Sequence, residues 1–288
     1  MCGRFVLVKI EIDGGYIWTK VWVGQEEFQD KAWFKKVVEG VRERYDIRPT
    51  QDVVIMKLEP KSKKVEMPRA RWGFQVPWMK APLINARSES LLESRTWSKA
   101  IKERRCIIPA TAFYEWQRRT DAEKNVPWEI RRKGGGTFYF AGLWKEHVDE
   151  TTGLGVFETT IITQPGNDLL RAVHNHGGNA GRQPVFLDND KIERWLDPDV
   201  TNPDDVMSCL RQIENGEWEG RMLTVIGDDK AHHPPIPREQ DAFTTNPDAP
   251  LSPERPYAKP EPAPRSTSTR KAQKKSAKKK GDDSDLFT

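Results

Sequence analysis

Cys2 has the most distinctive chemistry in the chain, because it becomes the first residue once Met1 is removed. Removal of methionine normally follows when the second residue is small, and cysteine is small. The new terminus carries an α-amine and a thiol with ordinary pKa values of about 7.7–8.0 and about 8.5, so both are partly nucleophilic near neutral pH. An aldehyde reacts with both groups: the amine forms a Schiff base, and the thiol adds to the same carbon to close a thiazolidine ring. An internal cysteine cannot form this ring, so Cys2 is a candidate for aldehyde capture.

The elements that must position such a terminus are mostly strands. Runs of β-branched and aromatic residues between turn signals predict strands at 4–8, 16–23, 53–58, 105–109, 128–132, 138–143, 156–163, 184–187 and 222–226. Apolar periodicity predicts fewer helices, at 26–39, 88–101, 167–173, 190–196 and 203–213. Helices do not alternate regularly with strands, which favours an α+β fold. We expect a curved, largely antiparallel sheet or barrel-like core with a few flanking helices.

The chain divides into two parts by composition. Residues 1–245 are typical of one globular domain, whereas residues 246–288 are rich in proline and then in lysine. Such a tail buries too little apolar surface to fold, so we expect it to be disordered. The net charge is only +4, but positions 259–280 hold nine Lys or Arg and a single acidic residue. This distribution suits a polyanionic partner better than a membrane.

Several classes of protein are disfavoured by the composition. The three cysteines, Cys2, Cys106 and Cys209, have no CxxC spacing, which argues against a disulfide scaffold and against a cysteine-built zinc site. We expect no metal and no cofactor. The sequence contains neither a long apolar run nor a secretory signal, so we expect a cytoplasmic protein, associated with the nucleoid if bacterial, with no membrane contact. Nothing in the sequence indicates an assembly larger than a monomer.

An ordered set of short motifs resembles one known family. The motifs are MCGRF at 1–5, RWGF at 71–74, VPW at 76–78, INARSE at 84–89, CIIPA at 106–110, FYEW at 113–116, IIT at 161–163, VHN at 173–175 and RQPV at 182–185. Together, and in this order, they closely resemble the SOS response-associated peptidase (SRAP) family. The resemblance implies recognition of abasic sites in single-stranded DNA, a covalent crosslink through the terminal cysteine, and autoproteolytic exposure of Cys2. A lyase activity on the DNA strand can follow from the Schiff base.

Matched motif by motif, the resemblance assigns the nucleophile to Cys2, an orienting amide to Asn85, a carboxylate to Glu115 and an imidazole to His174. The chemistry of these side chains agrees with the assigned roles. A carboxylate and an imidazole can transfer the protons that imine formation requires, and an amide can hold the sugar or the amine through hydrogen bonds. From the residues alone, Glu115 fits a solvent-facing strand position equally well, and His174 fits a cap or a core position. His176 is the alternative imidazole. We prefer His174, which directly follows an apolar segment and matches the family's His-Asn pair.

Four residues are candidates for contacts with DNA. Arg4 and Arg87 each lie two residues after a candidate site residue, and such positions share a face in an extended chain. Each can therefore reach a phosphate beside the reacting sugar, with a surface ion pair as the alternative. Trp72 and Trp78 lie in a loop-like stretch and can stack on bases, although core packing explains each equally well.

The sequence also departs from the family's pattern. A glycine-rich stretch at 177–181 separates the His-Asn pair from Arg182, Gln183 stands where methionine is common, and Asp46 adds negative charge near the expected DNA face. These departures affect the expected DNA contacts more than the chemistry. Two other functions stay open: a cysteine peptidase that uses Cys2 and His174 on other proteins, and a non-catalytic binder of single-stranded DNA.

The last residues of the tail form a further motif. Asp283, Ser284, Asp285, Leu286 and Phe287 resemble the short peptide, ending in Leu-Phe, that bacterial replication proteins dock into the sliding clamp. An apolar pair at the end of a flexible tether can fill a hydrophobic pocket. The usual leading glutamine is replaced by Asp283. A solubilising, disordered end is the alternative for the whole tail.

Overall fold

The computed structural model describes residues 2–7, 44–63, 65–149, 153–210 and 214–223. The strand expected at 16–23, the helix expected at 26–39 and the tail at 246–288 lie outside these residues. Within them the fold class is confirmed, because the protein is mostly strand with few helices and its sheet curls into a half-barrel. No helix in the part that the structure describes has the length and hydropathy needed to cross a membrane.

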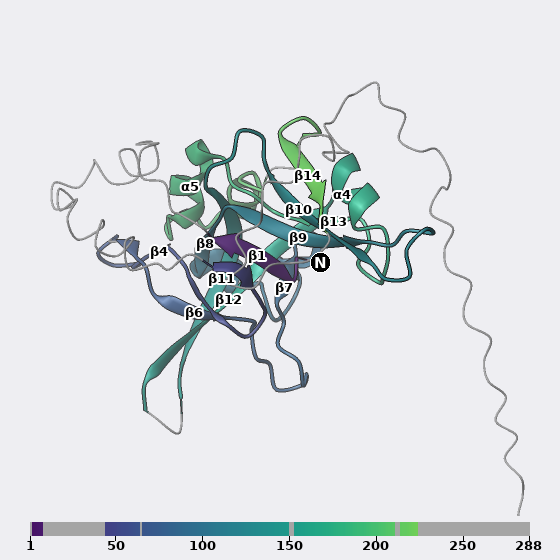
Figure 1. The fold of residues 1–288 in the computed structure, drawn as a ribbon. Helices are drawn as coiled ribbons and strands as arrows, with labels where there is room; N and C mark the ends of the chain where they lie inside the picture. Colours follow the sequence, from purple (N-terminus) through teal and green to yellow (C-terminus); the bar gives the residue numbers. More distant parts are fainter. Residues whose placement is uncertain (1, 8–43, 64, 150–152, 211–213, 224–288) are drawn as a thin grey trace, which may run out of the picture. The chain divides into compact units, whose positions relative to one another are not determined.

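The first sheet contains the strand that follows Cys2. Its five strands are antiparallel and run in the order β14-β10-β9-β1-β2, with β1 beside β9 (Figure 1). The register places Arg4 opposite Tyr114. The last strand starts before the expected 222–226, because its ladder with β10 already begins at Trp218. The strands are β1 (Arg4–Leu7), β2 (Arg44–Ile47), β9 (Ala112–Gln117), β10 (Val126–Arg132) and β14 (Trp218–Met222).

The second sheet is organised around one long strand, β12. Its main path is β3-β6-β12-β11-β8, and β7 and β13 also pair with β12. The β6 and β7 pairings with β12 are parallel and the others are antiparallel. Residues 158–164 of β12 are buried without interruption, which is typical of a strand covered on both faces. The strands are β3 (Asp52–Val54), β6 (Arg69–Trp72), β7 (Asn85–Arg87), β8 (Arg105–Ala110), β11 (Phe138–Val148), β12 (Gly155–Pro165) and β13 (Arg182–Pro184).

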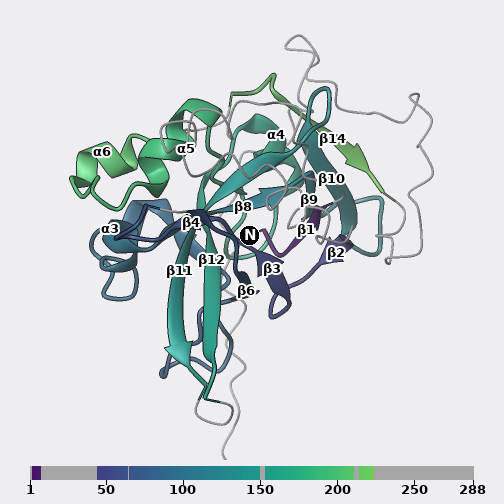
Figure 2. The ribbon, with the colours of Figure 1, turned by 90° about the vertical axis from the view of Figure 1, so that its left-hand side faces the viewer.

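The hairpin of β11 and β12 extends well beyond the strands around it (Figure 2). A small separate ladder joins β4 (Lys57–Leu58) to β5 (Val65–Glu66). Aromatic rings fill the space between the two large sheets. Phe5 of β1 contacts both Trp72 of β6 and Phe140 of β11, at centroid distances of 5.2 and 5.6 Å. The sheets are therefore joined by an apolar core directly behind β1.

The helices are short and lie in the connections between strands. The helix expected over 88–101 is wrong: one 3-10 turn, η2 (Ser88–Ser90), and one short helix, α3 (Ala100–Glu103), stand there with turns between them. The Ser94 hydroxyl accepts a hydrogen bond from the backbone of Thr96 at 3.2 Å, and such local bonds compete with helix formation. The other helices are α4 (Asp168–Val173), α5 (Asn189–Leu196) and α6 (Pro203–Met207).

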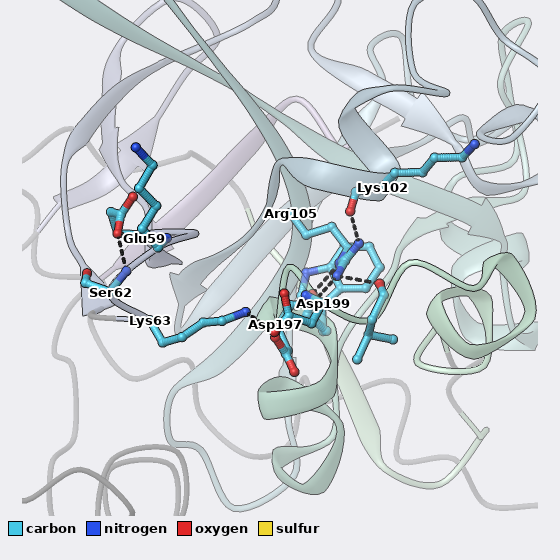
Figure 3. Close-up of polar contacts among 10 residues, drawn as sticks. Glu59, Ser62, Lys63, Lys102, Arg105, Asp197 and Asp199 are labelled. Carbon is cyan, nitrogen blue, oxygen red and sulfur yellow. Dashed lines mark hydrogen bonds and ion pairs between the residues drawn. The ribbon is translucent and has the colours of Figure 1, made fainter.

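A buried arginine holds the region around α3 and α5 together. The guanidinium of Arg105, at the start of β8, donates hydrogen bonds to backbone carbonyls, several of which are drawn in Figure 3. The acceptors are the carbonyl oxygens of Ile101, Lys102, Trp195, Asp197 and Val200, at 2.8, 2.7, 2.5, 2.5 and 3.0 Å. Four of these carbonyls lie in the last turn or at the C-cap of α3 or α5, so one side chain satisfies groups that short helices leave without internal partners.

Candidate active site

Cys2 lies fully buried just before β1, and Asn85 holds its backbone. The Asn85 Nδ2 atom donates a hydrogen bond to the carbonyl oxygen of Cys2 at 3.1 Å. Asn85 begins β7, where its pairing with Ile161 of the central strand β12 fixes its position. The thiol of Cys2 lies 3.9 Å from the carbonyl oxygen of Arg4, two residues further along the chain. The structure thus brings together the predicted nucleophile and the predicted orienting amide.

Glu115 is buried beside the start of β1, so the alternative of a solvent-facing strand position is wrong. It belongs to β9 and directly follows Tyr114, which lies opposite Arg4 in the ladder. Only 2% of its surface is exposed. Burial raises the pKa of Glu115 to about 8, because the charged form loses its hydration. The carboxyl group is therefore mainly protonated at neutral pH and can donate a proton.

His174 ends α4 and faces Glu115. Its Nδ1 atom lies 3.9 Å from the Glu115 Oε2 atom and 3.2 Å from the carbonyl oxygen of Arg182. A carbonyl only accepts, so this bond places the hydrogen on Nδ1 and a lone pair on Nε2. Burial lowers the pKa of His174 to about 4, which keeps the imidazole neutral at neutral pH. The pair is thus a protonated acid beside a neutral base, not an ion pair.

His176, the alternative imidazole, lies away from this pair. Its Nε2 atom is 2.8 Å from the Asn125 side-chain amide, and its ring centroid is 6.5 Å from that of His174. Of the two histidines, His174 is the one for which the structure records a contact with Glu115. The geometry therefore supports the choice of His174.

The two predicted phosphate-binding arginines both have partners within the protein. Arg4 Nε lies 3.5 Å from Asp46 Oδ1, and its guanidinium lies 5.4 Å from the ring of Trp116. Arg87 is exposed, and its Nη2 atom donates to Asn179 Oδ1 at 2.6 Å. Both side chains are at the surface beside residues of the site, but DNA must exchange with these partners to reach them.

The two predicted tryptophans have different environments. Trp72 has no exposed surface, packs on Phe5, and donates from Nε1 to the Ile84 carbonyl oxygen at 2.9 Å. A base cannot stack on a fully enclosed ring, so the expectation of a DNA contact at Trp72 is wrong and this ring belongs to the core. Trp78, in contrast, is 66% exposed. Its side chain is available for stacking.

The loop that presents Trp78 is anchored at its base by an ion pair between a buried glutamate and a partly exposed lysine, which the sequence reasoning missed. Glu158 Oε2 accepts from the backbone N–H of Gln75 at 2.8 Å, and Lys145 Nζ donates to the Gln75 carbonyl at 2.5 Å. Lys145 and Glu158 also contact each other at 2.8 Å. The pair comes from adjacent positions on β11 and β12. Opposite charges at paired positions of a hairpin are the sequence signal that points to such an anchor.

Asn175 and Arg182, on either side of the glycine-rich stretch, fasten it to the rest of the site. The Asn175 side chain accepts from the backbone of Arg118 at 2.8 Å and donates to it at 3.0 Å. Arg182 binds the Glu89 carboxylate through two bonds of 2.7 and 2.8 Å and donates to the Thr163 carbonyl at 2.8 Å. Both residues stand in the quoted motifs, but the sequence reasoning gave neither a role.

No site for a metal is apparent in the described ranges, where no three His, Cys, Asp or Glu side chains come together. The three cysteines are all buried and free. Burial raises the pKa of Cys106 to about 12, and Cys209 is likewise raised by burial. Both are therefore unreactive core thiols. Burial also raises the pKa of the Cys2 thiol, but Cys2 differs from the other two in its hydrogen bond with Asn85 and its electrostatic interaction with the buried acid Glu115.

Comparisons with known proteins agree with these motifs and this fold. The abasic site processing protein YoaM of Bacillus subtilis (strain 168) is 30% identical over 234 residues, which are 78% of this chain and 92% of that protein. The abasic site processing protein YoqW of the same organism is 32% identical over 187 residues, 63% of this chain and 79% of its own length.

The fold also matches solved structures. A crystal structure of a protein from Bacteroides thetaiotaomicron superposes with a TM-score of 0.60 at 20% identity, covering 77% of this chain and 92% of that one. This likeness shows a common fold. The family model described as SOS response associated peptidase (SRAP) matches residues 1–225, and the chain belongs to that family.

Proposed function

We propose that this protein processes abasic sites in single-stranded DNA, and that it captures them covalently through Cys2 after Met1 has been removed. The carrying observation is that Asn85 holds the Cys2 backbone and that the Cys2 thiol interacts electrostatically with Glu115, a buried acid paired with His174. The names of the Bacillus relatives, both abasic site processing proteins, support the substrate class. An abasic sugar opens to an aldehyde, which is the group that a terminal amine and thiol trap together.

The first chemical step is imine formation. The α-amine of Cys2 adds to the aldehyde carbon, and the resulting carbinolamine loses its hydroxyl group as water. Protonated Glu115 supplies the proton that makes this hydroxyl a leaving group, since burial holds its pKa at about 8. His174, neutral and with its lone pair on Nε2, can take up the proton that the amine releases.

The second step closes the ring. The Cys2 sulfur adds to the imine carbon and the imine nitrogen gains a proton, so no oxidant or further reactant is needed. The ring differs from the imine in being stable without reduction. If instead a base removes a proton next to the imine carbon, the strand breaks by elimination of the phosphate. The same imine thus accounts for both crosslinking and the proposed lyase activity.

DNA contacts are assigned to the exposed side chains of Arg87 and Trp78 and to the partly exposed side chain of Arg4. Arg4 and Arg87 bind phosphates next to the reacting sugar, and Trp78 stacks on a neighbouring base. We further propose that the protein exposes Cys2 by cleaving its own Met1–Cys2 bond. The assignment of Trp72 to DNA is withdrawn because that ring is enclosed by the core.

A peptidase acting on other proteins is less well supported by the electrostatics. A cysteine peptidase uses a thiolate beside an imidazolium. Here, burial and then the nearby Glu115 hold the pKa of the Cys2 thiol above its usual range. Burial also holds the His174 pKa below its usual range. Both shifts favour the neutral thiol and neutral imidazole, so the amine is the better first nucleophile.

The test uses single-stranded DNA with one abasic site, incubated with purified protein whose Met1 removal has been verified by mass spectrometry. On a denaturing gel we expect a shifted band for the wild type and none for Cys2→Ala. Cys2→Ser is the matched control of similar size: both variants keep the α-amine and lose the thiol, so each should give a band only after borohydride reduction. A wild-type protein without any band would overturn the proposal. Equal bands from a chain with an N-terminal extension would favour the thiol-only mechanism.

A third possibility is a protein that binds single-stranded DNA without reacting with it. It predicts affinity for intact single strands and no covalent band.

Binding to the sliding clamp is a separate proposal that rests on residues 283–287, outside the described residues. Deleting residues 283–288 should abolish binding of the full chain to a purified bacterial clamp. Unchanged affinity for the clamp would show that this peptide has another role.

A further inference from the structure

The glycine-rich stretch between His174 and Arg182 crosses from one part of the site to another. At its start, Asn175 is bound to the backbone of Arg118, and His176 contacts Asn125 in the β9–β10 connection. At its tip, Asn179 accepts the hydrogen bond from Arg87 of β7 at 2.6 Å. The stretch is therefore a defined loop, held by side-chain contacts at both ends.

The end of this loop is fixed to the same segment that carries Arg87. Arg182 binds both carboxylate oxygens of Glu89, two residues after Arg87. The backbone N–H of Gly181 donates to the His174 carbonyl at 2.6 Å, and Gly181 accepts from Gly166 at 2.7 Å. These bonds close the loop into a ring that starts and ends beside the imidazole. Asn179 is thus placed on Arg87 by the loop, and does not reach it merely as a mobile surface side chain.

We propose that the loop 176–181 weakens the binding of single-stranded DNA, with Asn179 occupying the guanidinium of Arg87 and competing with the DNA phosphate for it. The proposal rests on the proposed function, in which Arg87 binds a phosphate next to the abasic sugar. A side-chain amide oxygen accepts from a guanidinium in the same way as a phosphate oxygen, but without a negative charge. It therefore caps Arg87 weakly enough for DNA to displace it.

The consequence is easier release of undamaged DNA. Any single strand must exchange with Asn179 before it reaches Arg87, which lowers the affinity for intact and abasic strands alike. Only the abasic strand offers an aldehyde, and the crosslink that follows no longer depends on non-covalent affinity. Because phosphate binding is weak, intact strands dissociate from the protein, whereas an abasic strand stays attached through the covalent bond.

The experiment measures binding of the full chain to a short fluorescein-labelled oligonucleotide of intact single-stranded DNA by fluorescence anisotropy. Asn179→Ala should bind about two- to fivefold more tightly than the wild type, since the competing bond to a charged but exposed group is lost. Asn179→Asp should bind at least about threefold more weakly, because a carboxylate pairs with Arg87 and repels phosphate. Gly178→Ala is the control within the loop: its added methyl group meets open space, so affinity should not change.

A double-mutant cycle isolates the pair. On an Arg87→Ala background, which itself should weaken binding, Asn179→Ala should no longer raise the affinity. An unchanged or weakened affinity for the single Asn179→Ala variant would overturn the inference, as would the same gain in the absence of Arg87. Loss of the abasic crosslink in Cys2→Ala is measured separately on a denaturing gel. Because intact DNA forms no crosslink, failure of the binding test leaves the covalent mechanism standing, and failure of the crosslink test leaves the binding result interpretable.

Discussion

The side-chain amide of Asn85 donates a hydrogen bond to the carbonyl oxygen of Cys2 at 3.1 Å, and so ties Cys2, two residues before β1, to the first residue of β7. This bond fixes the backbone of the nucleophile and leaves its amine and thiol for chemistry. The Asn85 Oδ1 atom is buried and has no hydrogen-bond partner within the described residues. A buried acceptor without a partner suits an amine or hydroxyl of a bound reactant.

Replacing Asn85 should therefore slow the crosslink more than it weakens DNA binding. We expect Asn85→Ala to reduce the rate of crosslink formation by about tenfold or more, because the reacting group loses its orientation. Asn85→Asp should be at least as slow, since a carboxylate cannot donate to the Cys2 carbonyl. The measurement is a time course on a denaturing gel, with intact-strand affinity as the control. A wild-type rate for Asn85→Ala would mean that this bond is not used.

The burial of Glu115 should make stability depend on pH. The pKa of Glu115 is about 8 in the folded protein and about 4.3 in an unfolded chain, so the folded state retains a proton that the unfolded state releases. Stability is full below the unfolded value and is lost as the pH rises towards about 8. Glu115→Gln cannot ionise, so its stability relative to the wild type should increase over this window and then level off.

Urea unfolding at several pH values measures this difference. Glu103→Gln, at an exposed position of α3, is the matched control and should follow the wild type at every pH. If the curves of Glu115→Gln and the wild type ran parallel from acidic to alkaline pH, the carboxyl group would not be held in its protonated form. Glu115→Gln should also slow the crosslink at neutral pH, since an amide cannot supply the proton.

Substitutions of the two tryptophans should have different effects: Trp72→Ala should lower stability, and Trp78→Ala should weaken DNA binding. Trp72→Ala removes a fully buried ring and should lower the free energy of unfolding by about 3–5 kcal/mol. Trp78→Ala should change stability by no more than about 0.5 kcal/mol. It should weaken binding to single-stranded DNA by about 1–3 kcal/mol through loss of base stacking. Thermal melting and anisotropy measure the two effects, and a Trp78→Ala variant with unchanged affinity would exclude stacking there.

Arg105 should be indispensable for the region around α3 and α5. Arg105→Met leaves buried carbonyl oxygens without donors and should lower the free energy of unfolding by about 3 kcal/mol or more. Lys102→Ala is the matched control, because it keeps the backbone carbonyl that Arg105 binds and removes only an exposed side chain. Equal melting temperatures for the two variants would contradict this role.

The sequence predicted the fold class and supplied candidate site residues, but it did not predict the surroundings of those residues. Cys2, Asn85, Glu115 and His174 stand in short motifs that are readable one at a time. Their meeting depends on long-range pairing, since Glu115 comes from β9 and His174 from the end of α4. The burial that sets the pKa values of the acid and the base is a property of that packing. No local pattern contains it.

The errors have local explanations. The loop-like stretch around Trp72 suggests a DNA contact, although the alternation of polar and apolar residues before it places the ring on the buried face of β6. The helix expected at 88–101 failed because several serines and a threonine favour turns. The contact between Arg87 and Asn179 could not be foreseen, because the path of a glycine-rich loop is set by the bonds at its ends.

The structure of the crosslinked product is the most direct test of covalent capture by Cys2. After reaction with abasic single-stranded DNA, nuclease and protease digestion should yield an N-terminal peptide that lacks Met1. Mass spectrometry should show the sugar remnant attached to Cys2 with the loss of one water, and the bond should need no borohydride. A sugar attached to any lysine, or to a chain that still carries Met1, would contradict the mechanism.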